Sequence, residues 1–222
     1  MLISTLLIFV PISLGMIAHL YVQIQFRRLK NVYLTSGVKG QSVALQILQS
    51  VGIFDVVIDE IEDELGDYYD PTKKNLILST HSFHGTSISA VALAAHEAGH
   101  ALQDKIGYRW IVLRMKLIPT TLILSQLLPI LFFIGFFMQA VFVVKMTAFI
   151  YSILFILQWM TLGVEIDASK RASQLLLKLG IVNKDELTHV QPMLKAAVFI
   201  YFASFVSSFS DLFHLLLSSK QK

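Results

Sequence analysis

The sequence contains no cysteine, and only 15% of its 222 residues are charged. The absence of cysteine excludes disulfide bonds, thiolate metal sites and palmitoyl anchors, so any metal must be held by His, Asp or Glu. An ordinary soluble domain has roughly 25% charged residues. The formal charge of +3 comes with no Lys/Arg-rich stripe interleaved with aromatics, so we expect no nucleic-acid partner. A chain that is 55% hydrophobic and poor in charge is typical of a membrane protein.

Four apolar runs predict four transmembrane helices, since each is long enough to cross about 30 Å of hydrocarbon. They cover residues 1–26, 118–144, 146–164 and 196–217. No small-residue cleavage site follows the first run, so we expect it to be a retained anchor. Only Lys145 separates the middle two, which predicts a hairpin over 118–164 with a tight turn at that lysine. The last run is followed by a short tail, 218–222.

Two polar segments, 27–117 and 165–195, have the composition of a soluble domain. The first predicts a helix over 40–50 and, after a turn at Asp70–Pro71, a strand over Asn75–Ser79. Together they predict a small α+β head on a mainly α membrane protein with four transmembrane helices. We expect the strand to present an open edge to which an extended substrate can add.

The basic residues predict the orientation of the chain. Residues 27–117 contain ten of the 18 lysines and arginines, and residues 165–195 contain five. Four spans place both segments on one side of the membrane, and the positive-inside rule assigns that side to the cytoplasm. We therefore expect a multi-pass protein of the cell membrane with its head in the cytoplasm.

The stretch Val91–Ala101, VALAAHEAGHA, places three polar side chains on an apolar background. His96 and His100 are about 400° apart on a helix, so both imidazoles leave one face and can reach one metal ion. Glu97 lies about 100° from His96, close enough to reach a water at the metal. This H-E-x-x-H pattern is that of a zinc site with glutamate as general base. A chance match is the alternative, but three unpaired polar groups on an apolar helix would be costly.

A catalytic zinc site needs a third protein ligand and one open position. No histidine follows His100 at the spacing of H-x-x-G-x-x-H. Glu165 stands at the end of the third span, where the hairpin returns the chain to the side of the HEAGH helix. It is either a ligand or a charge that marks the end of the span. Asp167 is the rival ligand, and about 200° separates the two on a helix, so only one can face the zinc. Ser169 shares a face with Glu165 and could hydrogen-bond a ligand.

A second electrophile usually stabilises the oxyanion in peptide hydrolysis. The sequence does not choose among its candidates, which are Tyr68, Tyr69, His84, His189 and Arg171. His81 and His84 are three residues apart and could form a second metal site. A solvated loop is the interpretation that we favour.

Three motifs together resemble the YugP-type membrane zinc metallopeptidases: HEAGHALQ before a membrane hairpin, YDP followed by a strand ending in LS, and V-E-x-x-A-S-x-R-A after the hairpin. The resemblance covers nearly the whole chain. A more distant similarity is to the HtpX-type and CAAX prenyl membrane proteases, whose E-x-x-x-D motif matches Glu165 but has aspartate where this chain has Ser169. The resemblance implies a gluzincin-like head with His96, His100 and Glu165 as zinc ligands and Glu97 as base.

The expected function is that of a membrane-embedded zinc endopeptidase that hydrolyses peptides or membrane-protein substrates at the cytoplasmic face. The alternative is a non-proteolytic membrane adaptor that retains a structural zinc site. A metal-ion carrier is disfavoured because the spans contain almost no ionisable residues that could line a path. Small residues in the last span would permit close packing with another copy or another membrane protein: Ala203, Ser204, Ser207 and Ser208.

Overall fold

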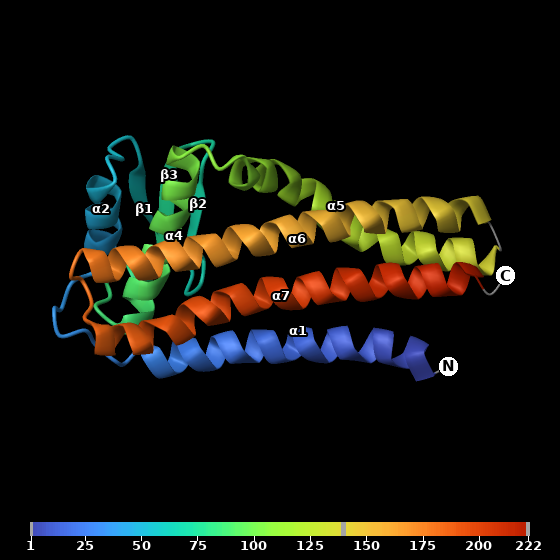
Figure 1. The fold of residues 1–222 in the computed structure, drawn as a ribbon, viewed down its shortest axis with the longest axis horizontal. Helices are drawn as coiled ribbons and strands as arrows, with labels where there is room; N and C mark the ends of the chain where they lie inside the picture. The colour runs from blue at the N-terminus through green and yellow to red at the C-terminus, as the bar shows by residue number, and fades with distance from the viewer. Residues whose placement is uncertain (1, 139–140, 221–222) are drawn as a thin grey trace.

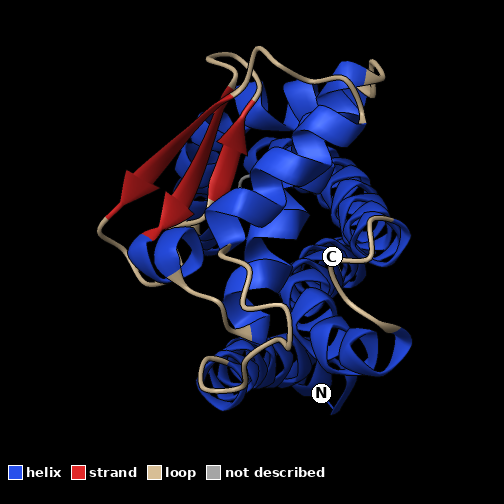
Figure 2. Cartoon of the chain, turned by 90° about the vertical axis from the view of Figure 1, so that its left-hand side faces the viewer, coloured by secondary structure: helices blue, strands red, loops and turns tan. Residues whose placement is uncertain are grey.

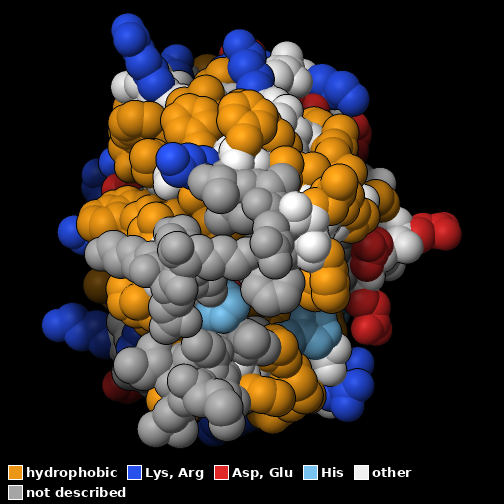
Figure 3. All heavy atoms as spheres, turned by 90° about the vertical axis from the view of Figure 1, so that its right-hand side faces the viewer, with side chains coloured by type: hydrophobic (Ala, Val, Ile, Leu, Met, Phe, Trp, Pro, Cys, Tyr) orange, Lys and Arg blue, Asp and Glu red, His pale blue; other side chains and the backbone are white. Residues whose placement is uncertain are grey.

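The computed structural model describes residues 2–138 and 141–220, and it is mainly helical (Figure 1). Its four long helices are α1 (Leu2–Leu29), α5 (Arg109–Phe137), α6 (Val141–Lys178) and α7 (Lys184–Lys220). Within the described residues, each contains a stretch long and apolar enough to cross a membrane, which confirms the four expected spans as helices of that kind. α7 packs against both α1 and α6, and α5 packs against α6. Seen from the end away from the head, hydrophobic side chains cover much of the surface (Figure 3).

The remaining elements form a small head at one end of these helices (Figure 2). It consists of α2 (Gly40–Ser50), β1 (Val57–Ile61), β2 (Tyr68–Asp70), β3 (Asn75–Ser79), α3 (Thr80–His84) and α4 (Ile88–Lys105). The expected helix over 40–50 and the expected strand over 75–79 are confirmed. The sheet has the order β1-β3-β2, with β1 parallel and β2 antiparallel to β3.

The expected open edge on β3 is wrong. β3 is the central strand, and its backbone pairs with β1 on one side and with β2 on the other. The sequence does not reveal that β3 is central, because its two partner strands, β1 and β2, are only five and three residues long. β2 is an edge strand of this sheet, and its residues Tyr68 and Tyr69 line the cavity of the candidate metal site described below.

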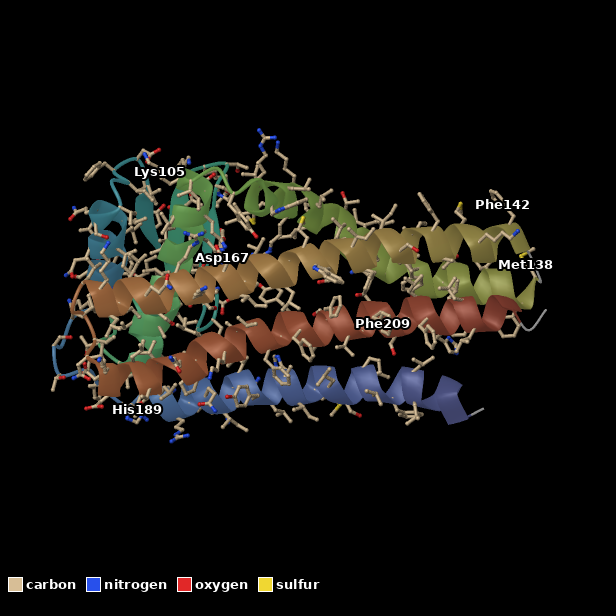
Figure 4. The ribbon with its side chains drawn as sticks, in the orientation of Figure 1. Lys105, Met138, Phe142, Asp167, His189 and Phe209 are labelled. Atoms are coloured by element: carbon tan, nitrogen blue, oxygen red, sulfur yellow. The ribbon has the colours of Figure 1, made fainter. Side chains whose placement is uncertain are left out.

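The expected turn at Lys145 is also wrong. α5 ends at Phe137, α6 begins at Val141, and Lys145 lies inside α6 (Figure 4 labels the flanking Met138 and Phe142). A lysine near the end of a span can extend its aliphatic stem to reach the interface, so its charge does not require a break in the helix. Residues 165–195 lie on two helices and the turn between them. They continue α6 and begin α7, with Gly180 at a φ of 66° in the turn between them.

α4 lies at the centre of the head and carries the HEAGH stretch. Ser87 is its N-cap, and the Ser87 hydroxyl accepts a hydrogen bond from the backbone N–H of Ala90. Alanine has the best helix propensity, and its small side chain lets neighbouring helices pack close to α4. α4 contacts α2, α6 and α7, and fifteen of its eighteen residues are buried.

Candidate metal centre

Three side chains of α4 project into the interior of the protein. His96, Glu97 and His100 are 4%, 7% and 5% exposed, and the two imidazole rings lie 4.7 Å apart between centroids. The edge-to-face arrangement of these rings follows from their spacing of one helical turn. Burial raises the pKa of the Glu97 carboxyl to about 7, with His96 opposing the rise and Glu165 adding to it.

α6 brings Glu165 to the same point. This carboxylate is 1% exposed, and its Oε2 lies 3.0 Å from His96 Nε2 and 3.7 Å from His100 Nε2. One ligand atom from each of the three residues lies within 4.8 Å of the other two. Ligand atoms on a tetrahedral zinc with bonds near 2.1 Å are about 3.4 Å apart, so both the donor set and the spacing fit that ion.

The hydrogen bonds behind the imidazoles aim both Nε2 atoms at Glu165. His96 Nδ1 lies 3.1 Å from the Ser169 hydroxyl, so this contact expected from the sequence is present. His100 Nδ1 lies 3.0 Å from Oε1 of the fully buried Gln103. The Gln103 amide nitrogen donates to the Val164 carbonyl, so its oxygen faces His100 and accepts the Nδ1 proton. Each imidazole is therefore oriented with Nε2 free to bind a metal.

Asp167, the rival ligand, lies outside this cluster. Its Oδ2 accepts hydrogen bonds from the Gln103 amide at 2.9 Å and from Arg171 Nε at 2.6 Å. Figure 4 shows it on α6 where that helix passes α4. Asp167 thus supports the imidazole of His100 through Gln103 and leaves the innermost position to Glu165.

The sequence pattern missed two residues beside Glu165. Arg114 of α5 forms an ion pair with Glu165 Oε1 at 2.5 Å, and its Nη2 donates to the Tyr201 hydroxyl at 2.8 Å. In the sequence, Arg114 is one of the ten basic residues of segment 27–117 that predict the orientation. Its position inside an apolar helix was the available signal, because a charge at that depth is a functional candidate by default. Tyr201 carried no signal, since a tyrosine in an apolar run is typical of a membrane interface.

The cluster opens into a cavity of about 490 Å³ where the head meets the long helices. His96, Glu97, His100 and Glu165 all line it. The rest of its wall comes from α1, α5, α7, β2 and the segment leading into β2, including the half-buried Asp67, whose pKa is raised by partial burial of its carboxyl. A substrate can therefore approach the metal ligands from a space bounded by both the head and the spans.

Only two of the five residues expected as candidates for stabilising the oxyanion line the cavity. Tyr68 and Tyr69 line it, although the Tyr69 hydroxyl donates to Asp104. The other three lie elsewhere: His84 contacts Glu60 on β1, Arg171 pairs with Asp167, and His189 lies at the head end of α7 (Figure 4). His81 lies near the Ser87 and Ser89 hydroxyls, so among the described residues it forms no metal cluster with His84.

Gly99 explains how α4 and α6 come close enough for Glu165 to lie beside the two histidines. A Cβ atom added at Gly99 would lie 2.7 Å from the carbonyl oxygen of Ala168, which is shorter than real Cβ contacts allow. Ala168 is itself fully buried. Two small residues therefore face each other at the crossing, and the backbones approach at the level of Glu165.

The long apolar helices and the buried His–His–Glu cluster with an adjacent glutamate define the class of the protein: a helical membrane protein with a candidate H-E-x-x-H metal site. The comparisons with known proteins give the family. Residues 4–220 match the family described as "Putative neutral zinc metallopeptidase", and the chain belongs to it. It is 33% identical over 206 residues to "Putative membrane protease YugP" of Bacillus subtilis (strain 168), an alignment that covers 93% of this chain and 92% of that protein. No solved structure matches the chain.

Proposed function

We propose that this protein is a membrane-embedded zinc endopeptidase that hydrolyses peptide bonds at the cytoplasmic face of the membrane. The observation that carries the proposal is the buried cluster of His96, His100 and Glu165, with Glu97 beside it and a cavity in front of it. His96, His100 and Glu165 would hold the zinc ion. When bound, zinc supplies Lewis acidity toward water and toward the peptide carbonyl.

Side chains of the protein would carry out the proton transfers of the proposed reaction and position the proposed metal ligands. Glu97 takes a proton from the attacking water and passes it to the leaving amine. The pKa of its carboxyl, about 7, suits a group that must both accept and release a proton near neutral pH. Arg114 holds the second oxygen of Glu165, which fixes the carboxylate that would bind the metal.

The geometry favours this proposal over an adaptor with a structural zinc site. Structural sites are closed by four protein ligands, whereas catalytic sites have three ligands and an open position. Here three ligands face a cavity, and the fourth nearby polar group is a carboxyl suited to proton transfer. The basic residues Arg27 and Arg28 lie in the last turn of α1, at the head end of that span, which supports a cytoplasmic head by the positive-inside rule.

Chelation provides the first test of the proposal. The purified full chain should contain one zinc ion and cleave an unfolded substrate such as casein. Removal of the zinc by a chelator should abolish cleavage, and added zinc should restore it. A juxtamembrane segment presented on its own transmembrane helix should also be cleaved, since the cavity lies between head and spans. Cleavage that persists in fully zinc-free protein, or a zinc-loaded protein that cleaves neither substrate, would contradict the peptidase.

Tyr201 is our choice for the residue that stabilises the oxyanion. Its hydroxyl lines the cavity, accepts a hydrogen bond from Arg114 and donates to the Glu165 carboxylate, so a substrate carbonyl beside Glu165 would compete for the same proton. Tyr201→Phe should lower kcat roughly 100-fold with little change in KM, because such donors act mainly in the transition state. Zinc content should stay at one per chain. The matched variant Tyr21→Phe, on α1 outside the cavity lining, should leave kcat unchanged. An equal effect of both substitutions would remove Tyr201 from the mechanism.

A further inference from the structure

A second hollow, of about 550 Å³, lies between α6 and α7. It shares no lining residue with the cavity in front of the metal centre. Its wall contains Leu162, Ile166, Ser169, Lys170, Ser173, Gln191, Leu194, Lys195, Val198, Phe199 and Phe202. Two lysines and no carboxylate are present in this set, so the hollow is a basic site with an otherwise apolar and hydroxylic wall.

The polar and apolar residues of the hollow separate along the helices. α6 and α7 are joined by a short turn, so they run in opposite directions and the residues nearest the turn lie at the head end. Ser173, Lys170, Gln191 and Lys195 are nearest to the turn. The apolar residues follow toward the far end, from Ile166 and Leu162 on α6 to Phe199 and Phe202 on α7. One end of the hollow is thus cationic, and the other end is apolar.

The change in polarity lies close to the level where the head meets the spans. The Phe199 ring contacts the Tyr21 ring of α1 with centroids 5.9 Å apart. Tyr21 is six residues, or about 9 Å, before Arg27, which lies in the basic last turn of α1. Lys195 is four residues, or about 6 Å, from Phe199 in the same direction. The lysine therefore lies near the level of the basic end of α1, and the phenylalanines lie at the depth of the apolar spans.

Both lysines are available for an external anion. Lys170 and Lys195 are exposed, and neither forms an ion pair within the described part of the chain. Asp167, the carboxylate nearest to Lys170 along α6, is already paired with Arg171. The side chains of Ile166 and Phe202 are 50% and 41% exposed. An apolar acyl chain lying along them would cover this exposed hydrophobic surface of the protein.

We propose that this hollow binds an anionic phospholipid of the inner leaflet. The phosphate contacts Lys170 and Lys195, the hydroxyl and amide groups of Ser173 and Gln191 donate to headgroup oxygens, and an acyl chain lies along Phe199 and Phe202. Basic pockets between transmembrane helices on the cytoplasmic side suit such headgroups. The gradient of polarity matches a phospholipid better than a peptide or a free phosphate, because the apolar half continues directly from the cationic half.

The lipid site lies directly behind the metal centre. Ser169 lines the hollow, and its hydroxyl also lies 3.1 Å from His96 Nδ1. A bound lipid would therefore cover the face of α6 that orients one of the proposed zinc ligands. The hydrogen bond from Ser169 to His96 is not part of the lipid site itself. The proposal that lipid binds in the hollow therefore does not depend on the proposed catalytic activity.

Native mass spectrometry of the full-length chain tests the proposal. The detergent-solubilised protein is mixed with phosphatidylglycerol or phosphatidylcholine of the same acyl chains. Wild type should bind the anionic lipid at least tenfold more tightly, with one high-affinity site per chain. Lys170→Gln with Lys195→Gln should weaken that binding about 25-fold, since each Lys near an anionic lipid contributes roughly fivefold. Lys178→Gln with Lys184→Gln, which lie on the same helices outside the hollow, should change it less than threefold.

Four outcomes would overturn the proposal. The first is equal affinity for the two lipids in wild-type protein, a comparison that needs no variant. The second is equal loss of binding in the two pairs of lysine variants, which would mean diffuse surface attraction. The third is displacement of the lipid by glycerol phosphate at millimolar concentration, which would assign the site to a free phosphate. A protein dimer that forms whenever the lipid is removed would assign the hollow to a second copy of the chain and would also overturn it.

Discussion

Replacing Glu97 by glutamine is expected to lower kcat by a factor of roughly 10² to 10⁴ while one zinc ion stays bound per chain. The amide fills the same buried volume beside His96 but cannot accept a proton from water. Glu97 is not a member of the cluster of His96, His100 and Glu165, so its charge is not needed to hold the metal. The measurement is casein cleavage by the zinc-loaded protein, with the zinc content of the same sample determined by atomic absorption.

The control for this substitution is Glu62→Gln, which removes an exposed carboxylate of the head and should leave kcat and zinc unchanged. The two readouts separate the hypotheses. Full activity in Glu97→Gln would show that another group accepts the proton. Loss of zinc together with activity would make Glu97 a ligand and would favour a closed, structural site, as the adaptor hypothesis requires.

Glu165→Ala should weaken zinc binding by more than 100-fold. Loss of a residue that only supports a ligand typically costs 10- to 100-fold in metal affinity, and Glu165 is proposed as a direct ligand. Asp167→Asn, two residues further along α6, should weaken binding less than tenfold because Asp167 acts only through Gln103. The affinity is measured by competition with a chelator of known strength. A larger effect at Asp167 than at Glu165 would restore Asp167 as the third ligand.

Glu165→Ala also leaves the guanidinium of Arg114 buried without its partner, which could unfold the site for reasons unrelated to zinc. The double variant Glu165→Ala with Arg114→Met removes both charges, and replacing a buried ion pair by apolar groups is often neutral for stability. This double variant should be folded by its elution profile and thermal unfolding, yet still bind zinc more than 100-fold more weakly. Near-normal zinc affinity in the folded double variant would exclude Glu165 as a ligand.

The sequence was most informative where chemistry depends on spacing along one helix. The four-residue interval of His96 and His100 determined which face of α4 they share, and the same rule brought Ser169 onto the face of Glu165. The length of the apolar runs was enough to predict the four long helices, because a transmembrane helix needs about 20 apolar residues whatever its neighbours are. The boundaries of α2 followed from local preferences in the same way.

The features that the sequence did not predict depend on contacts between distant segments. Arg114 and Tyr201 meet Glu165 only because α5, α6 and α7 converge, and no local pattern encodes that meeting. The central position of β3 depends on two partner strands, one of them only three residues long. Gln103 is a common helix residue whose role appears only when the Val164 carbonyl is placed beside it. The predicted turn at Lys145 was wrong because a lysine side chain can extend to the membrane interface, so its charge does not have to end the helix.

The division of the cluster between α4 and α6 has a consequence for how the protein is made. A ribosome releases His96 and His100 first, and Glu165 emerges only after all of α5 and much of α6. The third ligand thus joins the first two once the hairpin that separates them has been synthesised and has entered the bilayer. The proposed peptidase is therefore inert while it is a nascent chain.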